Sequence, residues 1–400
     1  MELRDYQVEA VEKGFAFLTT DKKPENKGII IAPTGSGKSL IVAKLAEELK
    51  HLGGVLTIQF SKELLEQNFA KFTLYGGNAS IFSASLNTKE VDTVTFSTIG
   101  SLKDKQKLFE HVKYVIVDEC HLVPPAKVRK NKSIDHSMFT AFIAGLDQSV
   151  KILGLTATAF RLKKFNDPFT GAPFSQINLL NRMRPMFFNK IVDVTQISEL
   201  YEKGFLCPIK YIPLHWDDGA LKVNTTGAEY TEESIDRALI DQGVIRRIPN
   251  IVEDSIAKGR KHRLVFVSSV ADAEYLAGRS PDSACVSAET KSKVREEILE
   301  QFKSGKIKTV YNVGVLTIGF DFPALDTIII ARPTMSLALY MQMIGRGIRL
   351  SEGKVDCAVV DMCGNYNRFG EIESIHYRVN AKGLWELANK DRVLSNVKIV

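Results

Sequence analysis

Cysteine and histidine are scarce in this sequence. Among its 400 residues there are five cysteines and seven histidines, and the cysteines form no C-x-x-C pair. A small and odd number of cysteines predicts no disulfide framework and is typical of a reducing compartment. The scattered histidines argue against a zinc cage. We therefore expect a cytoplasmic protein that depends neither on disulfides nor on a structural metal.

The sequence also lacks long apolar runs. None approaches the ~18 residues that span a bilayer, and residues 1–5 lack the basic and then apolar order of a signal peptide. With 44% apolar and 25% charged residues, the composition is that of an ordinary globular chain rather than a disordered one. We expect a soluble, intracellular protein without a membrane partner. At roughly 100 to 200 residues per domain, it should hold two or three domains.

Short β-branched runs alternate with longer helical patterns along most of the chain. Runs of this kind, when they are apolar throughout, are typical of strands buried on both faces of a parallel sheet. Alternation with helices predicts an α/β fold in both halves. The expected strands are residues 28–32, 114–117, 151–155, 264–267, 309–313, 327–330 and 358–360.

A domain boundary is predicted near residue 208. A helical segment at 198–203 ends at Gly204 and is followed by Pro208. A glycine and then a proline commonly follow the C-terminal end of a helix. This divides the chain into domains 1–208 and 209–400. Residues 160–190 lack clean periodicity and carry several prolines, so we expect an insertion or long loop there.

The sharpest local motif is a phosphate loop at residues 32–39, between an expected strand and a helix that runs to about Lys50. Its glycines let backbone N–H groups face an anion, and the helix N-terminus adds a favourable dipole. Lys38 can reach the β and γ phosphates of a nucleotide, and Ser39 can contribute its hydroxyl to Mg²⁺. Ala32 departs from the usual pattern, which has glycine there. The predicted nucleotide contacts in the loop are Thr34, Gly35, Ser36, Gly37, Lys38 and Ser39.

A second motif, Asp118-Glu119, follows the expected strand 114–117. A phosphate loop needs a carboxylate at the end of a neighbouring strand, so Asp118 is the candidate to hold Mg²⁺ through its water shell. Glu119 would orient or deprotonate the attacking water. A small-molecule kinase or a GTPase would satisfy both motifs equally.

Two arginines in the second half, Arg346 and Arg349, are spaced to lie on one helical face. Arginines that stabilise the charge of a phosphoryl-transfer transition state raise the rate of the reaction by roughly 10³- to 10⁵-fold. With these arginines added, the chain resembles a superfamily 2 helicase of the DEAD/DEAH-like group, in which residues 118–121 have the DExH form. The motifs come in the family's order at 3–7, 32–39, 118–121, 156–158, 315–323 and 342–349.

The resemblance implies two tandem RecA-like domains, with parallel sheets flanked by helices and an ATP cleft between the domains. ATP and Mg²⁺ are the implied cofactors. Gln7 would contact adenine with Arg4 nearby as a second nucleotide-binding residue, while Gly319 and Asp321 would approach the nucleotide from the second domain. The implied catalytic residues are Lys38, Glu119, Gln342, Arg346 and Arg349.

Nucleic-acid contacts and coupling residues are also implied, with less specific motifs. Ser61, Thr98 and Thr317 would bind backbone phosphates, although an ordinary helix cap or turn explains each hydroxyl about as well. In the family the Thr156–Thr158 motif couples the nucleotide site to strand movement. The residues predicted to contact nucleic acid or to couple it to the nucleotide site are Ser61, Thr98, His121, Thr156, Thr158, Arg161 and Thr317.

The net charge of +6 conceals one basic segment. Residues 127–190 carry eleven Lys and Arg against three acids, which is +8 and leaves −2 for the rest of the chain. Arg161, Lys163 and Lys164 in this segment could form a phosphate track, with Phe165, Phe169 and Phe174 as stacking surfaces. The alternative is that these phenylalanines only anchor a loop.

The sequence therefore predicts an ATP-driven motor on nucleic acid. The Thr156–Thr158 motif and the tail at 361–370 resemble phage-type, recombination or restriction-related DNA motors, so we expect DNA rather than RNA. The alternatives are an RNA helicase, a translocase or ATP-gated clamp that never separates strands, and a metabolic kinase. We expect a monomer, and a phage within a bacterial host is one possible source. Without an added cysteine-rich module, its targeting would depend on the basic insertion or on a recruiting protein.

Overall fold

The computed structural model describes residues 2–23, 25–124, 127–128, 134–135, 137–166, 169, 173–316 and 321–399. The chain forms two compact units. The first contains residues 1–161 and 178–196, and the second contains 162–177 and 197–400. The chain thus passes finally into the second unit after Gln196, whereas the sequence placed the division at 208.

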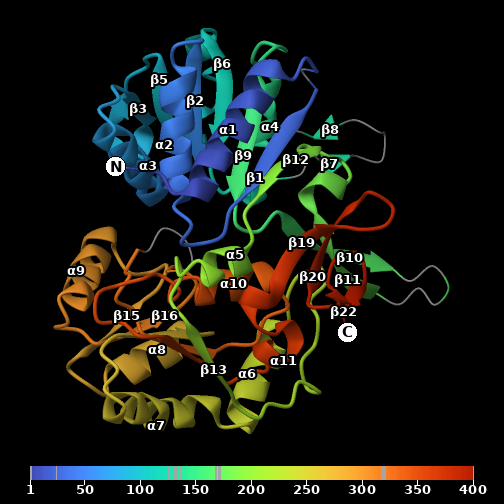
Figure 1. Ribbon diagram of the computed structural model, residues 1–400. Coiled ribbons are helices and arrows are strands. Elements are labelled where there is room, and N and C mark those ends of the chain that lie inside the picture. Colours follow the sequence, from blue (N-terminus) through green and yellow to red (C-terminus); the bar gives the residue numbers. More distant parts are fainter. Residues whose placement is uncertain are drawn as a thin grey trace. The chain divides into compact units, whose positions relative to one another are not determined.

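The first unit is built on an eight-stranded sheet (Figure 1). Its order is β12-β1-β9-β6-β2-β5-β3-β4, and every neighbouring pair is parallel except β3 with β4. The strands are β1 (Lys27–Ile31), β2 (Gly54–Gln59), β3 (Ser80–Ser83), β4 (Thr88–Lys89), β5 (Val94–Thr98), β6 (Val112–Val117), β9 (Lys151–Thr156) and β12 (Lys190–Val194).

Helices α1 (Asp5–Thr20), α2 (Lys38–Leu49), α3 (Lys62–Leu74) and α4 (Met138–Ala144) belong to the same unit. Apolar residues of α1, α2 and α3 share one buried core with the sheet, where Leu45 and Phe72 lie among Ile30 and Phe96. A short antiparallel pair, β7 (Lys127–Val128) and β8 (Ile134–Asp135), completes the unit. The alternation of buried strands and helices is the predicted α/β architecture.

The second unit has a six-stranded parallel sheet in the order β13-β18-β17-β14-β16-β15. Its strands are β13 (Ile209–Pro213), β14 (Arg263–Val267), β15 (Ser283–Val286), β16 (Thr309–Asn312), β17 (Thr327–Ala331) and β18 (Cys357–Asp361). Its helices are α5 (Ile197–Glu202), α6 (Glu232–Asp241), α7 (Val244–Ala257), α8 (Val270–Ala277), α9 (Ser292–Lys303), α10 (Leu337–Ile344) and α11 (Asn365–Phe369). Two parallel sheets with helices confirm the α/β fold class.

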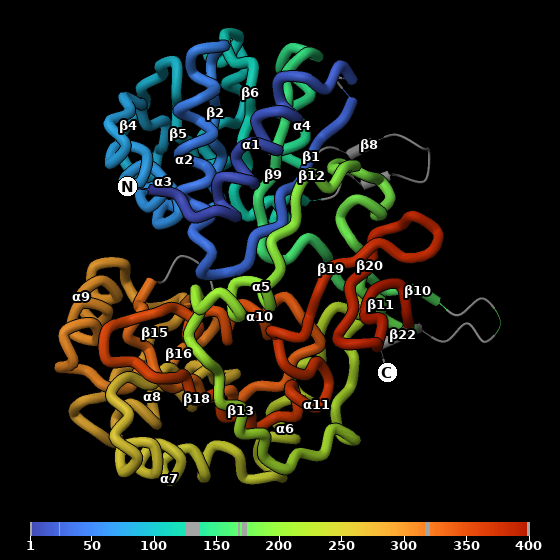
Figure 2. Tube along the Cα trace, viewed as in Figure 1, coloured from blue at the N-terminus to red at the C-terminus, as the bar shows by residue number. Residues whose placement is uncertain are grey.

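Residues 160–179 differ from the expected long loop, because they form strands β10 (Phe160–Asn166) and β11 (Pro173–Leu179). These strands join β22 (Lys398–Ile399) in a three-stranded sheet, and β11 pairs antiparallel with the C-terminal strand (Figure 2). Such pairing joins segments far apart in sequence, so local periodicity could not indicate it. A further antiparallel sheet contains β19 (Ile375–Val379), β20 (Trp385–Asn389) and β21 (Arg392–Val393).

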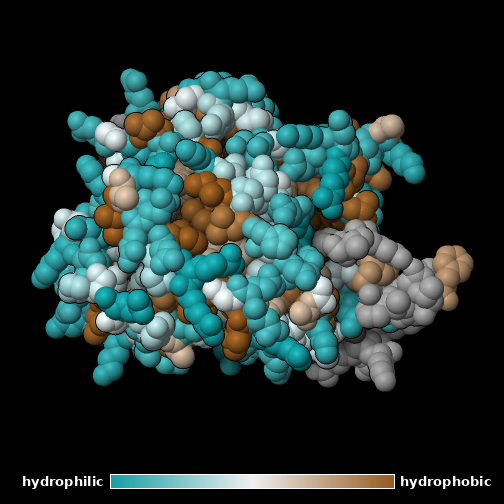
Figure 3. All heavy atoms as spheres, turned by 90° about the horizontal axis from the view of Figure 1, so that it is seen from below, coloured by the Kyte–Doolittle hydropathy of each residue, from teal (hydrophilic) through white to brown (hydrophobic). Residues whose placement is uncertain are grey.

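The face of the molecule in Figure 3 is mostly hydrophilic, with hydrophobic side chains gathered in smaller areas. Apolar atoms contribute much of the surface of any folded protein, so small areas of this kind do not by themselves indicate a function. Among the helices of the described residues, none has both the length and the hydropathy to cross a membrane.

Candidate nucleotide and nucleic-acid site

The predicted motifs of the first unit gather at one edge of its sheet. The phosphate loop follows β1, Thr156–Thr158 begins at the end of β9, Asp118 follows β6 and Ser61 follows β2. These four strands are consecutive neighbours in the sheet and run parallel. Their carboxyl ends therefore meet at a single edge, which is where open α/β sheets bind ligands.

Glycine is required in the phosphate loop at Gly37, where φ is +78°. A Cβ there would lie 2.5 Å from Gln7 Nε2, so any other residue would be strained at this φ and would also push the Gln7 amide aside. Tyr6 Oη and Gln7 Nε2, both from α1, donate hydrogen bonds of 2.8 and 2.7 Å to the Ser36 carbonyl. Gln7 Oε1 also accepts from the Arg4 amide at 2.9 Å. Tyr6 and Gln7 thus support the phosphate loop directly, a role that the sequence did not indicate, and the predicted contact with adenine stays a prediction.

The side chains of Lys38, in this loop, and Glu119, after β6, lie close to each other. The Lys38 ammonium lies 3.6 Å from Glu119 Oε1 and 3.5 Å from the Ala32 carbonyl oxygen. Glu119 adopts a left-handed backbone conformation with φ of 49°, which is uncommon for a residue with a side chain and costs energy. The structure therefore pairs the proposed phosphate-binding cation with the proposed base, and nucleotide phosphates would compete with Glu119 for Lys38.

Asp118 is only 2% exposed at the end of β6. Its Oδ2 accepts a 2.8 Å hydrogen bond from Asn68 Nδ2, and its Oδ1 accepts the Glu119 amide at 2.9 Å. Burial, with the Glu119 carboxylate beside it, raises the pKa of Asp118 to about 6, against the opposing charge of Lys38. Burial therefore disfavours the ionised form of this carboxyl, and the charge of Lys38 opposes that effect.

These groups fit Mg²⁺ better than a metal held by protein ligands alone. Mg²⁺ in nucleotide sites usually takes one or two carboxylates and completes its shell with phosphates and water. Asp118 supplies one carboxylate, and Ser39 lies in the first turn of α2 at the same sheet edge. Within the described ranges there is no cluster of three or more His, Cys, Asp or Glu residues that could hold a metal.

A hydrogen-bonded chain links the Asp118-Glu119 motif to the Thr156–Thr158 motif. His121 Nδ1 lies 2.8 Å from Thr156 Oγ1 and 3.3 Å from Glu119 Oε2. Thr156 Oγ1 in turn accepts the Thr158 amide at 3.0 Å. All three of His121, Thr156 and Thr158 are buried. A displacement of either motif would therefore disturb the other, which suits a coupling role.

Arg161 contacts the Asp118-Glu119 motif in a way that its sequence did not indicate. Its Nε donates to the His121 carbonyl at 2.7 Å, and its guanidinium also donates to the carbonyls of His121 and Val123. Burial lowers the pKa of this guanidinium from its ordinary value. The predicted contact with nucleic acid stays a prediction, but in the structure this side chain braces the turn that carries Glu119.

Two predicted phosphate ligands take part in local hydrogen bonds. Ser61 Oγ accepts the Leu64 amide at 3.2 Å and so caps α3. Thr98 Oγ1 lies 3.2 Å from Ser83 Oγ and 2.9 Å from Ser101 Oγ. The cap and turn roles left open by the sequence are therefore present, and phosphate binding by these hydroxyls stays a prediction.

The rest of the basic segment lies partly in the hairpin of β10 and β11. Lys163 lies over the Phe165 ring at 5.5 Å, and Phe165 stacks on Phe174 with 5.8 Å between ring centroids. Phe169 is 95% exposed. Two of the three phenylalanines thus pack within the hairpin, as the anchoring alternative expected. The side chains of Lys127, Arg129, Lys130 and Lys132 lie outside the described residues.

In the second unit, the predicted arginines do not continue a helix. Helix α10 contains Gln342 and ends at Ile344, so Arg346 and Arg349 lie in the turn beyond it. Arg346 is 7% exposed, and Arg349 forms an ion pair with Asp321. The expectation that both arginines lie on one face of a helix is therefore wrong, because they follow the end of α10. Thr317 and Gly319 lie outside the described residues.

Two family models match the chain. Residues 1–161 match the res subunit of type III restriction enzymes, and residues 244–351 match the helicase conserved C-terminal domain. The first match ends at Arg161, within β10, where the chain first leaves the first unit, and it includes the phosphate loop and Asp118-Glu119. The second includes the described arginines of the α10 turn.

Curated relatives and solved structures agree with these matches. The chain is 24% identical to the putative ATP-dependent helicase IRC3 of Saccharomyces cerevisiae, covering 90% of this chain and 51% of the relative. It is 23% identical to the DNA 3'-5' helicase XPB of Mycobacterium tuberculosis, covering 80% of this chain and 53% of the relative. The chain thus spans about half the length of these relatives. The type ISP restriction-modification enzyme LlaBIII bound to DNA has a similar fold, with a TM-score of 0.62 and 16% identity, covering 91% of this chain and 28% of that one.

Proposed function

Because this chain belongs to helicase superfamily 2, we propose that it hydrolyses ATP to ADP and phosphate in order to move along nucleic acid or to separate its strands. The observation that carries the proposal is the sheet edge of the first unit. There the phosphate loop, Asp118-Glu119 and the Thr156–Thr158 motif follow three adjacent strands, and the last two are hydrogen-bonded through His121.

The chemistry follows from the residues of that edge. Nucleotide phosphates at the N-terminus of α2 would draw Lys38 away from Glu119, which frees the carboxylate to orient and deprotonate the attacking water. Mg²⁺, held by Ser39 and Asp118, would neutralise the charge of the phosphates. We further propose that Gln342, Arg346 and Arg349 act from the second unit, where the arginines would stabilise charge on the transferred phosphoryl group.

The polymer is proposed to be DNA. The relative XPB is named a DNA 3'-5' helicase, and the LlaBIII structure is of an enzyme bound to DNA. Movement would arise because His121 and Arg161 join the hydrolytic motif to Thr156 and to the first residues of β10. A translocase that tracks DNA without opening it uses the same parts, so strand separation needs its own measurement. A monomer, with a recruiting protein for targeting, is part of this proposal.

The function is tested by measuring ATPase activity with single-stranded DNA, duplex DNA, forked DNA and RNA, beside strand displacement on the fork. We expect DNA to stimulate turnover more than RNA does. Lys38→Ala should remove turnover on every polymer, because the phosphates lose their cation, while Lys44→Ala, at a partly exposed lysine of the same helix that pairs with Glu48, should not. An ATPase that ignores all nucleic acids would refute the motor. Stimulation without displacement would instead establish the translocase.

The basic hairpin gives a separate prediction. We expect Lys163→Gln with Lys164→Gln to weaken single-stranded DNA binding and to reduce the slope of log K against log salt by about 0.7 for each phosphate that the variant no longer neutralises. Arg161→Gln should lower turnover, because its guanidinium bonds His121 and Val123, and a smaller slope in this variant as well would support its predicted contact with nucleic acid. Fluorescence anisotropy titrations at several salt concentrations measure both slopes.

The matched control for the hairpin is the pair Lys303→Gln with Lys306→Gln, which removes two exposed charges elsewhere in the second unit. Its salt slope should stay at the wild-type value. An equal reduction of the slope in both double variants would mean that the hairpin contributes only general charge.

A further inference from the structure

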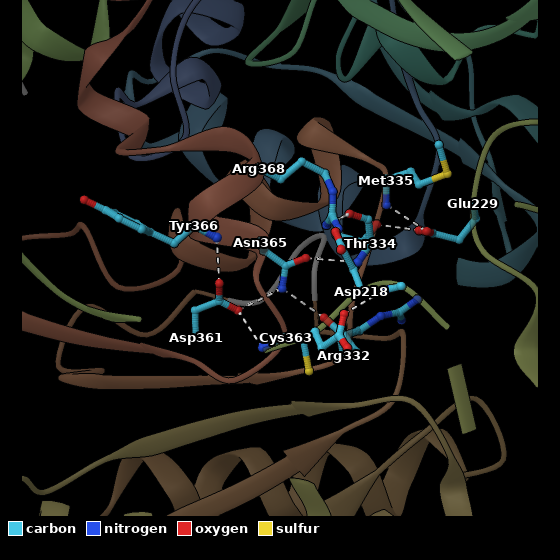
Figure 4. A network of polar contacts seen from close by, with 12 residues as sticks. Asp218, Glu229, Arg332, Thr334, Met335, Asp361, Cys363, Asn365, Tyr366 and Arg368 are labelled. Atoms are coloured by element: carbon cyan, nitrogen blue, oxygen red, sulfur yellow. Dashed lines mark hydrogen bonds and ion pairs between the residues drawn. The ribbon is translucent and has the colours of Figure 1, made fainter. Parts of the chain in front are cut away.

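The tail segment 361–370, singled out in the sequence only by resemblance, forms the centre of a polar network in the second unit (Figure 4). Asp361 ends β18 and is 2% exposed. Its Oδ1 accepts from Asn365 Nδ2 at 2.9 Å and from the Cys363 amide at 3.2 Å, while its Oδ2 accepts the Tyr366 amide at 2.6 Å. Asp361 thus organises the turn that starts α11.

Glycine is required in this turn at Gly364, where φ is +68° and a Cβ would lie 2.7 Å from the Trp216 ring. The turn is therefore closely packed as well as hydrogen-bonded. This packing gives the side chain of the next residue, the fully buried Asn365, a fixed direction.

Asn365 connects this turn to the loop that enters α10. Its Oδ1 accepts the Thr334 amide at 2.9 Å, and its Nδ2 also donates to the Arg332 carbonyl at 3.1 Å. Arg368, on α11, donates to the Thr334 carbonyl at 3.0 Å and to Asp218 Oδ2 at 3.2 Å. Both backbone groups of Thr334 are thus held by side chains of α11.

Glu229 holds the same loop from another side. Thr334 Oγ1 donates to its Oε2, and the Met335 amide donates to its Oε1 at 2.8 Å. The Ser336 amide then donates to Thr334 Oγ1 at 2.9 Å, and Ser336 Oγ caps α10 by accepting the Leu339 amide at 3.2 Å. The first turn of α10 is therefore fixed through Thr334.

The same tail segment meets α10 a second time. Tyr340, fully buried in α10, donates its hydroxyl to the Gly370 carbonyl at 3.1 Å, and its ring lies 5.4 Å from that of Phe369. The segment therefore holds α10 at its entry and near its middle. Gln342 follows two residues after Tyr340, and Arg346 lies in the turn that ends the helix.

We propose that the 361–370 segment and Glu229 position α10, so that Gln342 and Arg346 are held ready for the nucleotide. The inference rests on the proposed function, because it assigns these residues to the same hydrolytic reaction. Asp361, Asn365, Arg368, Tyr340 and Glu229 are positioning residues, since they act through α10. Helix α10 has only eight residues, about 12 Å at 1.5 Å per residue, so we expect a shift at its entry to reach the turn that carries Arg346.

The test measures kcat and KM for ATP in the presence of saturating DNA, with amide hydrogen exchange of the peptide 332–349. Asn365→Ala and Glu229→Ala are expected to lower kcat about ten- to hundredfold, as a misplacement of about 1 Å does. KM for ATP should change less than about twofold, and exchange should rise in that peptide. Glu229→Gln keeps an acceptor for Met335 and should retain most of the activity.

Tyr340→Phe, which removes only the hydroxyl bonded to Gly370, guards against loss of folding and should lower kcat by a smaller factor in the same direction. Arg378→Ala is the matched control, because it breaks the 2.8 Å pair with Glu386 on β19 and β20 and should leave kcat unchanged. Wild-type kcat in Asn365→Ala and Glu229→Ala would overturn the inference while the ATPase itself stands. If the wild-type protein has no DNA-stimulated ATPase, the proposed function is refuted, and the inference is refuted with it. Faster exchange of peptide 332–349 in the variants would then show only that these residues stabilise the packing of α10.

Discussion

Glu119→Gln is expected to lower DNA-stimulated ATP turnover by about 10² to 10⁴, the usual contribution of a general base, while ATP binding persists. The structure explains both halves of this result. The carboxylate lies at the sheet edge beside the phosphate loop, and its Oε1 is 3.6 Å from the Lys38 ammonium. Removing its charge abolishes the base and at the same time releases Lys38 for the phosphates, so ATP affinity should be equal to or higher than in the wild type.

Turnover is measured by phosphate release, and affinity by titration with a fluorescent ATP analogue. Glu66→Gln, on the exposed face of α3 and paired with Lys62, is the matched control and should behave as the wild type. If Glu119→Gln turns over normally, another residue is the base. If it loses ATP binding as well, Glu119 serves mainly to hold its strained turn.

Arg346→Ala is expected to lower kcat by about 10³ or more, with little change in ATP affinity, because arginines at phosphoryl groups act chiefly on the transition state. Arg349→Ala should act in the same direction and also releases Asp321. Arg346→Lys should recover little of the rate, since an ammonium cannot replace a planar fork of donors. Steady-state kinetics and equilibrium ATP binding separate the two effects.

Arg237→Ala is the control for this experiment, because it removes an arginine whose side chain is 81% exposed on α6. It should leave both constants unchanged. Since Arg346 is 7% exposed, the melting temperature of each variant is needed as well. A folded Arg346→Ala protein with full turnover would remove this residue from the catalytic set.

The first-unit motifs lie at the strand ends where the sequence pattern predicts them, whereas the second-unit arginines do not lie on the expected helix; the roles of these residues stay predictions. Lys38, Asp118 and Glu119 each follow an apolar strand within a few residues, so strand periodicity alone brings them to one edge. Arg346 and Arg349 were expected on one helical face, but α10 ends at Ile344 before either arginine. Nothing in an R-x-x-R spacing distinguishes a last helical turn from the tight turn that follows a helix.

Arg161 is the clearest case of a role hidden from the sequence. In residues 127–190 it is one of eleven positive charges that outweigh three acids, which is typical of a phosphate track. In the structure its guanidinium bonds the carbonyls of His121 and Val123. A carbonyl acceptor leaves no trace in composition, because every residue has one, so only the tertiary arrangement could identify this partner.

The sequence by itself determined the α/β class, the order of the motifs and the phosphate loop, because each depends on periodicity and spacing within a short stretch of chain. The tertiary structure alone decided which motifs touch: Gln7 with Ser36, His121 with Thr156, and Asn365 with Thr334. It also joined β11 to β22 and Tyr340 to Gly370. These contacts join segments far apart in the chain, and a hydrogen bond between them depends on where packing places both partners, which no local pattern records.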